Sequence, residues 1–308
     1  MQPIYDVIII GGGAAGYSAA LYTARAGLST LVLEKLSPGG QMATTDQIDN
    51  YPGFPNGIDG FTLGMQMQEG AQRFGTNTEY TEVLSLDLAP KIKTIRTDSG
   101  DFSARTVILA TGAFPKELGL AREKELWGKG VHYCAHCDGR FYKDKTVMVV
   151  GGGNSAVADA LYLSRLCKEV VLVHRRDSLR ATKIYHEPLM KAPNVRFYWD
   201  SRIVSLHGDD RLHGVTVENL KSGAKTELPL DGLFISIGRS PETALFAGQI
   251  QLDEKGYIAA GEDCATSLPG VFAAGDVRTK AVRQVITAAA DGAVAATMAE
   301  NYLAAQEM

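Results

Sequence analysis

Apolar runs and helical patterns alternate from the start of the chain. Residues 4–10 form a nearly unbroken run of mostly β-branched apolar residues, as in parallel strands that are buried on both faces. A glycine cluster follows, then a helical pattern over residues 14–26 and a second apolar run over residues 30–33. Strand, helix and strand in this order predict a βαβ unit at the beginning of the chain.

The same pattern returns in the middle of the chain. An apolar run over residues 147–150 leads into the glycine turn 151-GGGNSA-156, a helical pattern over 157–166 and another apolar run over 170–173. The interval from Gly11 to Glu34, just after the second strand of the first unit, equals the interval from Gly151 to His174 in the second. An internal repeat of this kind indicates two dinucleotide-binding domains.

The rest of the pattern suggests how the two domains are connected. Patterns typical of strands occupy residues 80–110 and 195–237, and an Ala-rich helical pattern covers 281–303. Short Pro-containing stretches near residues 114–115 and 240–241 flank the second unit, and we interpret them as crossings between domains. We therefore predict an α/β fold with two Rossmann-like domains, the second inserted into the first. Their predicted ranges are 1–115 with 241–308 for the first domain and 116–240 for the second.

Composition and charge exclude several classes of protein. The 308 residues are 45% hydrophobic and 21% charged, which is ordinary for a globular protein and excludes disordered, collagen-like and coiled-coil chains. The net charge is −4 and no basic stripe stands out, so we expect no nucleic-acid or membrane partner. No basic segment precedes the first apolar run, and no run approaches the ~20 residues of a membrane span. We therefore expect a cytoplasmic protein.

The first glycine cluster, 11-GGGAAG-16, has the spacing of a dinucleotide-binding turn. Gly11 permits a tight turn, Gly13 lets a pyrophosphate approach the backbone, and Gly16 lets the helix pack closely on the strand. The helix N-terminus then offers free N–H groups to the phosphates. Glu34, after the second strand, is placed to accept hydrogen bonds from ribose hydroxyls.

The second unit carries a basic segment, 174-HRRDSLR-180, in place of the acidic residue. Guanidinium groups match phosphate oxygens, so this segment suits the 2′-phosphate of NADP(H). A solvated basic turn is the alternative. The predicted NADPH-binding residues are Gly151, Gly153, Asn154, Ser155, His174, Arg175, Arg176 and Arg180.

The segment 134-CAHCD-138 contains two of the four cysteines. Vicinal thiols at this spacing can close a small disulfide and exchange it with another disulfide. Asp138 follows directly and can donate or accept a proton during the exchange. We predict a catalytic site made of Cys134, Cys137 and Asp138.

Half of a zinc site is the main alternative for this segment. A structural zinc site needs four ligands, and the other two cysteines, Cys167 and Cys264, are isolated in the sequence. His132 and His136 are close, but the segment is too short to enclose a metal ion. We therefore predict no metal site, and we interpret Cys167 and Cys264 as packing residues.

Taken in order, these motifs resemble the low-molecular-weight bacterial thioredoxin reductases over essentially the whole chain. Further matches are 39-GGQMATTDQIDNYPG-53, 110-ATGA-113, 133-YCAHCDG-139, 235-ISIGRSPET-243, 269-PGVFAAGDV-277 and then Arg283-Gln284. The resemblance implies that electrons pass from NADPH through FAD and the Cys134–Cys137 pair to oxidised thioredoxin. It also implies that the protein is a homodimer. Within each chain, it implies that Cys137 faces the flavin and that Cys134 attacks the disulfide of thioredoxin.

The resemblance further implies which residues hold FAD in the first domain. Gln41 and Asn50 would lie near the flavin or its ribityl chain, and Asp276 would bind a ribityl hydroxyl. The full implied set is Gly11, Gly13, Gly16, Glu34, Gln41, Asn50, Thr111, Gly112, Asp276, Arg283 and Gln284.

One departure from the family pattern lies between the two cysteines. His136 stands where the family usually has Thr, which leaves the reaction type intact but affects the expected redox potential. The imidazole either stabilises a thiolate or is a tolerated variation.

Three other functions compete with the reductase. A flavin-binding redox sensor would signal through a protein interface without turnover. A ferredoxin–NADP reductase of similar fold would lack the dithiol. An oxygen-using dithiol oxidase would not need Arg175 and Arg176.

Overall fold

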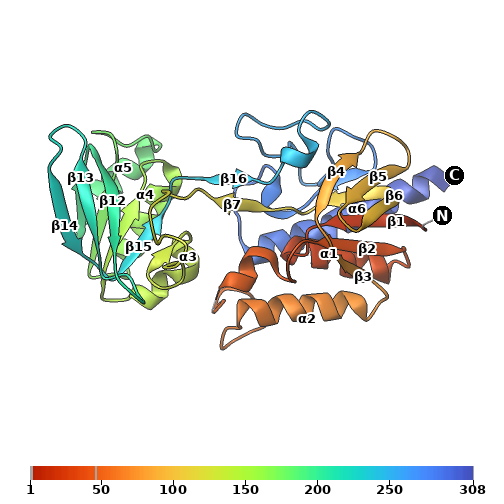
Figure 1. The fold of residues 1–308 in the computed structure, drawn as a ribbon, viewed down its shortest axis with the longest axis horizontal. Coiled ribbons are helices and arrows are strands. Elements are labelled where there is room, and N and C mark those ends of the chain that lie inside the picture. Colours follow the sequence, from red (N-terminus) through yellow and green to blue (C-terminus); the bar gives the residue numbers. More distant parts are fainter. Residues whose placement is uncertain (1–2, 46, 308) are drawn as a thin grey trace. The chain divides into compact units, whose positions relative to one another are not determined.

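The computed structural model describes residues 3–45 and 47–307, which form two compact units. Unit 1 comprises Met1–Phe114 and Ser240–Met308, and unit 2 comprises Pro115–Arg239. These limits differ by one residue from the predicted domain ranges. The two crossings, β7 (Ala113–Pro115) and β16 (Arg239–Pro241), pair with each other in a two-stranded sheet (Figure 1). Unit 2 is thus an insertion in unit 1.

Unit 1 is built on a seven-stranded sheet (Figure 1). Its central strands are parallel, and β4 and β5 extend it in antiparallel fashion. The strand order is β3 (Asn77–Tyr80), β2 (Thr30–Glu34), β1 (Ile4–Ile10), β6 (Gly100–Leu109), β5 (Lys93–Thr97) and β4 (Val83–Asp87), with β17 (Val271–Ala273) also paired to β6.

Strand β6 passes through a polar interruption in the apolar sequence pattern. It is one continuous strand, although its polar residues Arg105 and Thr106 separate two apolar runs. On one side it pairs with β1 from Ser103 to Leu109. On the other side its first half pairs with β5 and its second half with β17. Backbone pairing with β1 therefore keeps β6 in strand conformation across the two polar residues.

The described part of unit 1 also contains three α-helices: α1 (Ala14–Arg25), α2 (Gly60–Gln72) and α6 (Val285–Glu307). Helix α1 packs against both α6 and α2. Alternate residues of β1 face opposite sides of the sheet: Val7 and Ile9 pack in the core shared with α1 and α6, whereas Ile8 and Ile10 pack in the core that contains Phe246. Burial on both faces explains the unbroken apolar run.

Two helices of unit 1 depart from the sequence expectation. Helix α2 was not predicted, although Asp59 marks its start by accepting a hydrogen bond from the Thr62 N–H at 2.7 Å. Helix α6 begins at Val285, later than the predicted residue 281. The Arg283 guanidinium donates hydrogen bonds to backbone carbonyls of residues 276, 278 and 280, which holds the preceding segment as a loop.

Unit 2 repeats the architecture on a smaller scale. A five-stranded parallel sheet has α4 (Asn154–Ser164) on one face and a three-stranded antiparallel sheet on the other (Figure 1). The five strands are β11 (Val195–Tyr198), β10 (Glu169–Val173), β9 (Thr146–Val150), β15 (Gly232–Ile235) and β8 (Val131–His132). The antiparallel sheet contains β12 (Ser201–His207), β13 (Gly214–Asn219) and β14 (Lys225–Pro229), and α3 (Ala135–Asp138) and α5 (His186–Met190) are short helices. The predicted fold class is confirmed.

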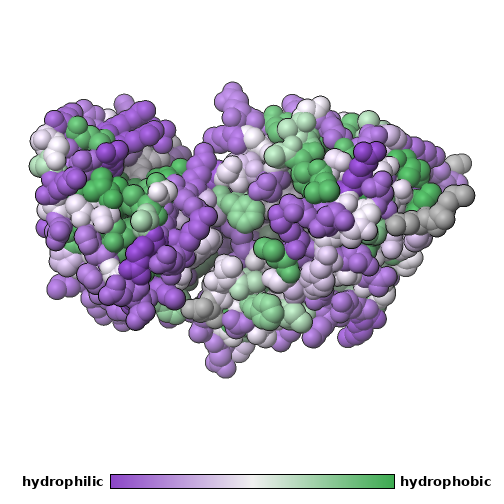
Figure 2. Space-filling model, viewed as in Figure 1, coloured by the Kyte–Doolittle hydropathy of each residue, from purple (hydrophilic) through white to green (hydrophobic). Residues whose placement is uncertain are grey.

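Hydrophilic residues dominate the visible surface of both units, with hydrophobic residues gathered in small patches (Figure 2). None of the helices in the described part of the chain combines the length and apolar character needed to cross a bilayer.

Candidate active site and nucleotide-binding sites

The two vicinal cysteines lie at the start of a short helix in unit 2. Cys134 and Cys137 form a disulfide, and α3 begins directly after Cys134. The Cys137 N–H donates a hydrogen bond to the Cys134 sulfur at 3.2 Å, and both side chains are partly exposed. The pair is therefore accessible and carries a backbone donor aimed at one of its sulfurs.

The two remaining cysteines have a different environment. Cys167 and Cys264 are buried free thiols. Burial raises the pKa of each to about 11, so both stay protonated and unreactive near neutral pH. No group of three or more His, Cys, Asp or Glu side chains within residues 3–45 and 47–307 is placed to hold a metal ion.

Asp138 lies at the end of α3 and contacts a buried histidine. One of its carboxylate oxygens is 3.2 Å from Nδ1 of His132, whose Nε2 is 2.7 Å from the Tyr142 hydroxyl. The sequence marked His132 only as an unsuitable zinc ligand, and nothing in the sequence marked Tyr142. Both ring nitrogens of His132 therefore make polar contacts, Nδ1 with Asp138 and Nε2 with Tyr142.

The first glycine turn has the geometry of a phosphate cradle. Gly11 has a φ of +103°, and a Cβ on Gly16 would lie 1.9 Å from the Gly11 carbonyl oxygen. Within residues 3–45 and 47–307, and apart from the chain neighbours of Gly13, the nearest atom to a Cβ added there would be the Gly39 carbonyl oxygen at 4.0 Å. The backbone at Gly13 is thus open to a ligand, while Gly11 and Gly16 are required by the turn itself.

The residue that follows the second strand of the repeat differs between the two units: it is Glu34 in unit 1 and His174 in unit 2. In unit 1, Glu34 accepts hydrogen bonds from the Gly12 N–H at 2.6 Å and the Leu36 N–H at 3.0 Å. In unit 2, the His174 ring packs over Gly152, where a Cβ would lie 2.4 Å from the ring. The structure therefore places a hydrogen-bond acceptor beside the first turn and an imidazole beside the second.

The other residues expected to hold FAD are distributed over unit 1. Gln41 donates to the Ala113 carbonyl at 2.6 Å, and Thr111 donates to the Glu242 carbonyl at 2.7 Å. Asn50 donates to the Gln284 side chain at 3.1 Å, which joins segments far apart in the sequence.

Gly112 and Asp276 also occupy positions suited to a ligand. Gly112 has a φ of +75°, and among the described residues apart from its chain neighbours an added Cβ would have only the Gln41 amide, at 3.7 Å, within 4 Å. Asp276 is partly buried in a short 3₁₀ turn at Gly275–Val277, which follows β17. Open backbone at Gly13 and Gly112, with the Glu34 carboxylate nearby in the first turn, fits a dinucleotide with an extended chain.

The second glycine turn has the same geometry as the first. Gly151 has a φ of +145°, and a Cβ there would lie 2.5 Å from the Ser236 carbonyl oxygen. Apart from its two chain neighbours, no residue in the described part of the chain comes within 4 Å of a Cβ added to Gly153. Asn154 begins α4 and accepts a hydrogen bond from the Thr182 N–H at 2.8 Å, while Ser155 is exposed in the first turn of α4.

Positive charge gathers beside this turn. Burial lowers the pKa of His174, and the charges of Arg180, Arg176 and Arg175 lower it further. The three arginines are exposed, while His174 itself is buried. Exposed guanidinium groups around a neutral imidazole form a site suited to a phosphate group.

Comparisons with known proteins give matches over nearly the whole chain. The family model described as pyridine nucleotide-disulphide oxidoreductase matches residues 5–292. A thioredoxin reductase of Streptomyces clavuligerus is 47% identical, covering 99% of this chain and 96% of the relative. One from Listeria monocytogenes is 44% identical, covering 98% of this chain and 95% of the relative.

Solved structures with the same description also match over nearly the full chain. The thioredoxin reductase of Streptococcus pyogenes is 41% identical with a TM-score of 0.92, covering 99% of this chain and 100% of that one. The Lactococcus lactis enzyme, described as the FR conformation, is also 41% identical but has a TM-score of 0.69, covering 98% and 99% of the two chains.

Proposed function

Because the chain belongs to the pyridine nucleotide-disulphide oxidoreductase family, we propose that it is an NADPH-dependent thioredoxin-disulfide reductase. The observation that carries the proposal is the partly exposed Cys134–Cys137 disulfide, which lies in the unit that contains the second glycine turn. The net reaction takes NADPH, one proton and a protein disulfide to NADP⁺ and a protein dithiol.

FAD fits unit 1 as the resident cofactor. The open backbone at Gly13 would face the pyrophosphate, Glu34 would accept from the ribose, and Asp276 would accept from the ribityl chain. When bound, FAD supplies two-electron transfer between the nicotinamide and the disulfide.

NADPH fits unit 2. The open backbone at Gly153 and the N-terminus of α4 would face its pyrophosphate. Arg175, Arg176 and Arg180 would bind the 2′-phosphate, which NADH lacks, so their charge makes the site selective for NADPH.

The reduced pair would react with thioredoxin by thiol–disulfide exchange. The Cys134 thiolate attacks one sulfur of the partner disulfide, forming a mixed disulfide and releasing the partner's other sulfur as a thiolate. Cys137 then attacks the Cys134 sulfur, which releases the reduced partner and restores the enzyme disulfide. The Cys137 N–H, which donates to the Cys134 sulfur, favours the Cys134 thiolate.

Asp138 would handle the protons of this exchange. It accepts a proton from the second thiol as that thiol attacks, and it donates a proton to the leaving thiolate. By the same family resemblance, we propose that the protein acts in the cytoplasm as a homodimer, and light scattering of the purified protein tests the dimer.

NADPH oxidation with and without oxidised thioredoxin tests the proposed function. Thioredoxin-dependent oxidation by the parent chain, absent from Cys134→Ser, supports a reductase. Oxidation that consumes oxygen without thioredoxin indicates a dithiol oxidase instead. Binding of FAD and NADPH with no disulfide-dependent turnover indicates a redox sensor.

A further inference from the structure

A buried carboxylate of unit 2 contacts the residue that precedes the redox motif. Glu123 is 1% exposed and lies in the segment between β7 and β8. Its two carboxylate oxygens accept hydrogen bonds from three consecutive backbone N–H groups of the same segment, those of Leu118 and Gly119 at 2.8 Å and that of Leu120 at 3.1 Å. None of the steps described above uses this carboxylate.

The backbone of this segment is shaped around the carboxylate. Gly119 has a φ of +76°, and successive N–H groups that converge around such a residue form a nest that binds an anion. Arg122, next to Glu123, has a φ of +69°, which costs energy in a residue that carries a Cβ. The Arg122 guanidinium donates a hydrogen bond to the Asp209 carbonyl at 2.5 Å, and this contact helps to hold the unusual conformation.

The fourth donor to the carboxylate is Tyr133, which directly precedes Cys134. The Tyr133 hydroxyl donates to Glu123 at 2.8 Å, and its ring packs edge-on against Trp127 with 4.9 Å between ring centroids. Burial raises the pKa of Tyr133, and the hydrogen bond and charge of Glu123 raise it further. The hydroxyl therefore stays protonated and remains a donor throughout the pH range in which thiols react.

Tyr133 occupies the short junction between a strand and the redox motif. Strand β8 ends at His132, and α3 begins directly after Cys134. The side chains of neighbouring residues in an extended segment point to opposite faces. Accordingly, the His132 ring stacks on Phe234 in the core beneath α4, whereas Tyr133 packs in the core on the other face of the sheet. Side-chain contacts therefore hold the junction on both faces.

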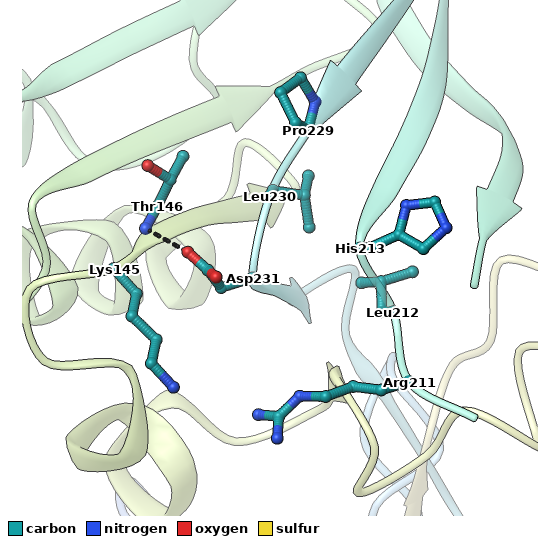
Figure 3. Close-up of a pocket in the computed structure, with 8 residues that line it drawn as sticks. All are labelled: Lys145, Thr146, Arg211, Leu212, His213, Pro229, Leu230 and Asp231. Atoms are coloured by element: carbon teal, nitrogen blue, oxygen red, sulfur yellow. Dashed lines mark hydrogen bonds between the residues drawn. The ribbon is translucent and has the colours of Figure 1, made fainter. Parts of the chain in front are cut away.

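The Glu123 carboxylate is shielded from solvent. Tyr133, Leu118 and Leu120 pack against the hydrophobic core on the face of the unit 2 sheet that the antiparallel strands cover. That core reaches the surface at a pocket of about 340 Å³, where Leu212 and Leu230 form part of the wall (Figure 3). Neither Glu123 nor Tyr133 lines this pocket, so it gives solvent no access to their hydrogen bond.

We propose that Glu123 and Tyr133 are positioning residues of the dithiol, because the hydrogen bond between them holds the backbone at Cys134 where its sulfur can reach Cys137. The proposal rests on the proposed function only in taking these two cysteines as the reacting pair. In the oxidised protein the disulfide itself restrains Cys134. In the reduced protein that restraint is absent, and the contact between Tyr133 and Glu123 keeps the two sulfurs close together.

This positioning affects the equilibrium between dithiol and disulfide. Two thiols that are already close lose little conformational freedom when the S–S bond forms, so positioning favours the disulfide. Without the hydrogen bond, Cys134 gains freedom in the reduced protein, and closing the disulfide must remove it again. The disulfide then becomes easier to reduce. The attack of Cys137 on the Cys134 sulfur of a mixed disulfide should become slower for the same reason.

The test uses Tyr133→Phe, which removes the hydroxyl and keeps the ring against Trp127. The matched control is Tyr162→Phe, which keeps a ring that packs against His136 at 4.3 Å and removes a hydroxyl that makes no hydrogen bond within residues 3–45 and 47–307. Each holoenzyme is equilibrated in buffers of reduced and oxidised glutathione. Two glutathione thiols are oxidised to one glutathione disulfide as the enzyme S–S bond is reduced to two thiols. Alkylation in denaturant followed by mass spectrometry measures the reduced fraction.

Tyr133→Phe is expected to shift this equilibrium about tenfold toward the dithiol, which makes the reduction potential about 30 mV less negative. Tyr162→Phe should stay within about twofold of the parent. When the pre-reduced proteins are mixed with oxidised thioredoxin, Tyr133→Phe should also hold the mixed disulfide longer than the parent does. An unchanged potential in Tyr133→Phe, or an equal shift in the control, overturns the proposal.

A second variant removes the acceptor. The side-chain amide of Glu123→Gln carries two N–H donors in place of one acceptor oxygen, so it cannot satisfy the nest and Tyr133 together. We expect a shift in potential at least as large as that of Tyr133→Phe. The double variant should shift no further than Glu123→Gln alone, because both changes remove the same hydrogen bond. Additive shifts contradict a shared role, and Tyr133→Phe alone decides the question if Glu123→Gln does not fold.

The glutathione equilibrium needs neither NADPH nor thioredoxin, so it separates this proposal from the proposed function. If the parent chain fails to reduce thioredoxin while Tyr133→Phe shifts the potential, the proposed function is wrong and the positioning role stands. If the parent reduces thioredoxin and the potential of Tyr133→Phe is unchanged, only the positioning role is wrong. Retained FAD and an unfolding midpoint near that of the parent show that a shift does not come from loss of the fold.

Discussion

At the scale of single residues, one position of the internal repeat separates the two nucleotide sites. Glu34 accepts hydrogen bonds from the first glycine turn and its own loop, whereas His174 packs on the second turn beside three arginines. A carboxylate next to a 2′-phosphate would repel it, and a guanidinium next to it would bind it. We therefore propose that the identity of this residue and its neighbours decides which dinucleotide each unit binds.

Replacing both Arg175 and Arg176 by Ala should raise the KM for NADPH at least about a hundredfold, since each lost charge-assisted bond is worth about a factor of ten or more. The KM for NADH should change little. Steady-state kinetics with both nucleotides provide the measurement. The control is Arg202→Ala, which removes an exposed arginine of unit 2 that pairs with Glu218. Equal losses with NADH and NADPH would remove the assignment of the 2′-phosphate site.

The two cysteines should also behave differently. Cys137→Ser keeps the attacking Cys134 thiol and removes the resolving one, so it should accumulate a mixed disulfide with thioredoxin. Cys134→Ser should not. Mass spectrometry of the non-reduced mixture distinguishes the two variants, and both should still let NADPH reduce the flavin. A mixed disulfide trapped by Cys134→Ser instead would reverse the proposed polarity.

The absorption spectrum provides a second measurement of the same polarity. If Cys137 lies against the flavin, Cys134→Ser should show a broad long-wavelength band from its thiolate that disappears on acidification. Cys137→Ser should lack this band, because a serine hydroxyl is not ionised near neutral pH. A band in neither variant would mean that no thiolate contacts the flavin.

At the scale of elements, α6 is attached to unit 1 by a buried group of charges. Asp291, on α6, is 7% exposed and pairs with Arg278 and Lys280, each at 2.8 Å. It also accepts from the Gly275 N–H at 2.9 Å, next to Asp276. The helix is therefore joined to the turn that carries a predicted FAD ligand. Close packing against α1 also holds α6 in place, since a Cβ on Gly292 would lie 2.2 Å from a backbone oxygen of α1.

Asp291→Asn should destabilise the protein by about 3–5 kcal/mol, because it leaves two buried cations without their anion. Chemical denaturation measures the loss. Glu300→Gln, an exposed acid on the same helix, should change stability by less than about 0.5 kcal/mol. Similar effects of the two changes would show that the buried pairs contribute little.

The same group predicts a dependence of stability on pH. Burial raises the pKa of Asp291, but Arg278 and Lys280 outweigh it, and the net pKa lies below the usual value of 3.8. A lowered pKa in the folded state means that the contribution is complete above the unfolded pKa and is lost as pH falls through the folded one. The stability difference between parent and Asp291→Asn should therefore shrink below about pH 4, as followed by denaturation at several pH values.

At the scale of the whole molecule, two short paired strands connect two separately packed units. Each unit has its own sheet and its own cores, and the crossings β7 and β16 are three residues each.

One dithiol must react with both the flavin and a protein partner, so we predict a hinge rotation about the crossings during turnover. A bifunctional cross-linker that fixes the two units together should leave FAD bound yet stop thioredoxin reduction. Cleaving a cleavable linker should restore the rate, and a monofunctional version of the reagent serves as the control. Full activity in the cross-linked protein would contradict the hinge.

The sequence alone determined the features that depend on local pattern. The strand over residues 4–10 was predicted with its observed limits. A strand that is buried on both faces of a sheet is a continuous apolar run, so the ends of the run mark the ends of the strand. The glycine turns and the Cys134–Cys137 pair were equally readable, since their chemistry depends on residues a few positions apart. The cofactors and the partner followed from these motifs and from the family resemblance.

Tertiary structure alone decided the features that depend on residues distant in sequence. Strand β6 continues through Arg105 and Thr106 because β1 lies beside it, and α2 carries too many glycines for its pattern to be read. His132 was interpreted only by its distance from the cysteines along the chain. Its contacts with Asp138 and Tyr142 exist only because the fold brings β8 beside α3 and the segment that follows α3. Such contacts arise from tertiary packing, and the spacing of residues along a short stretch of sequence does not predict them.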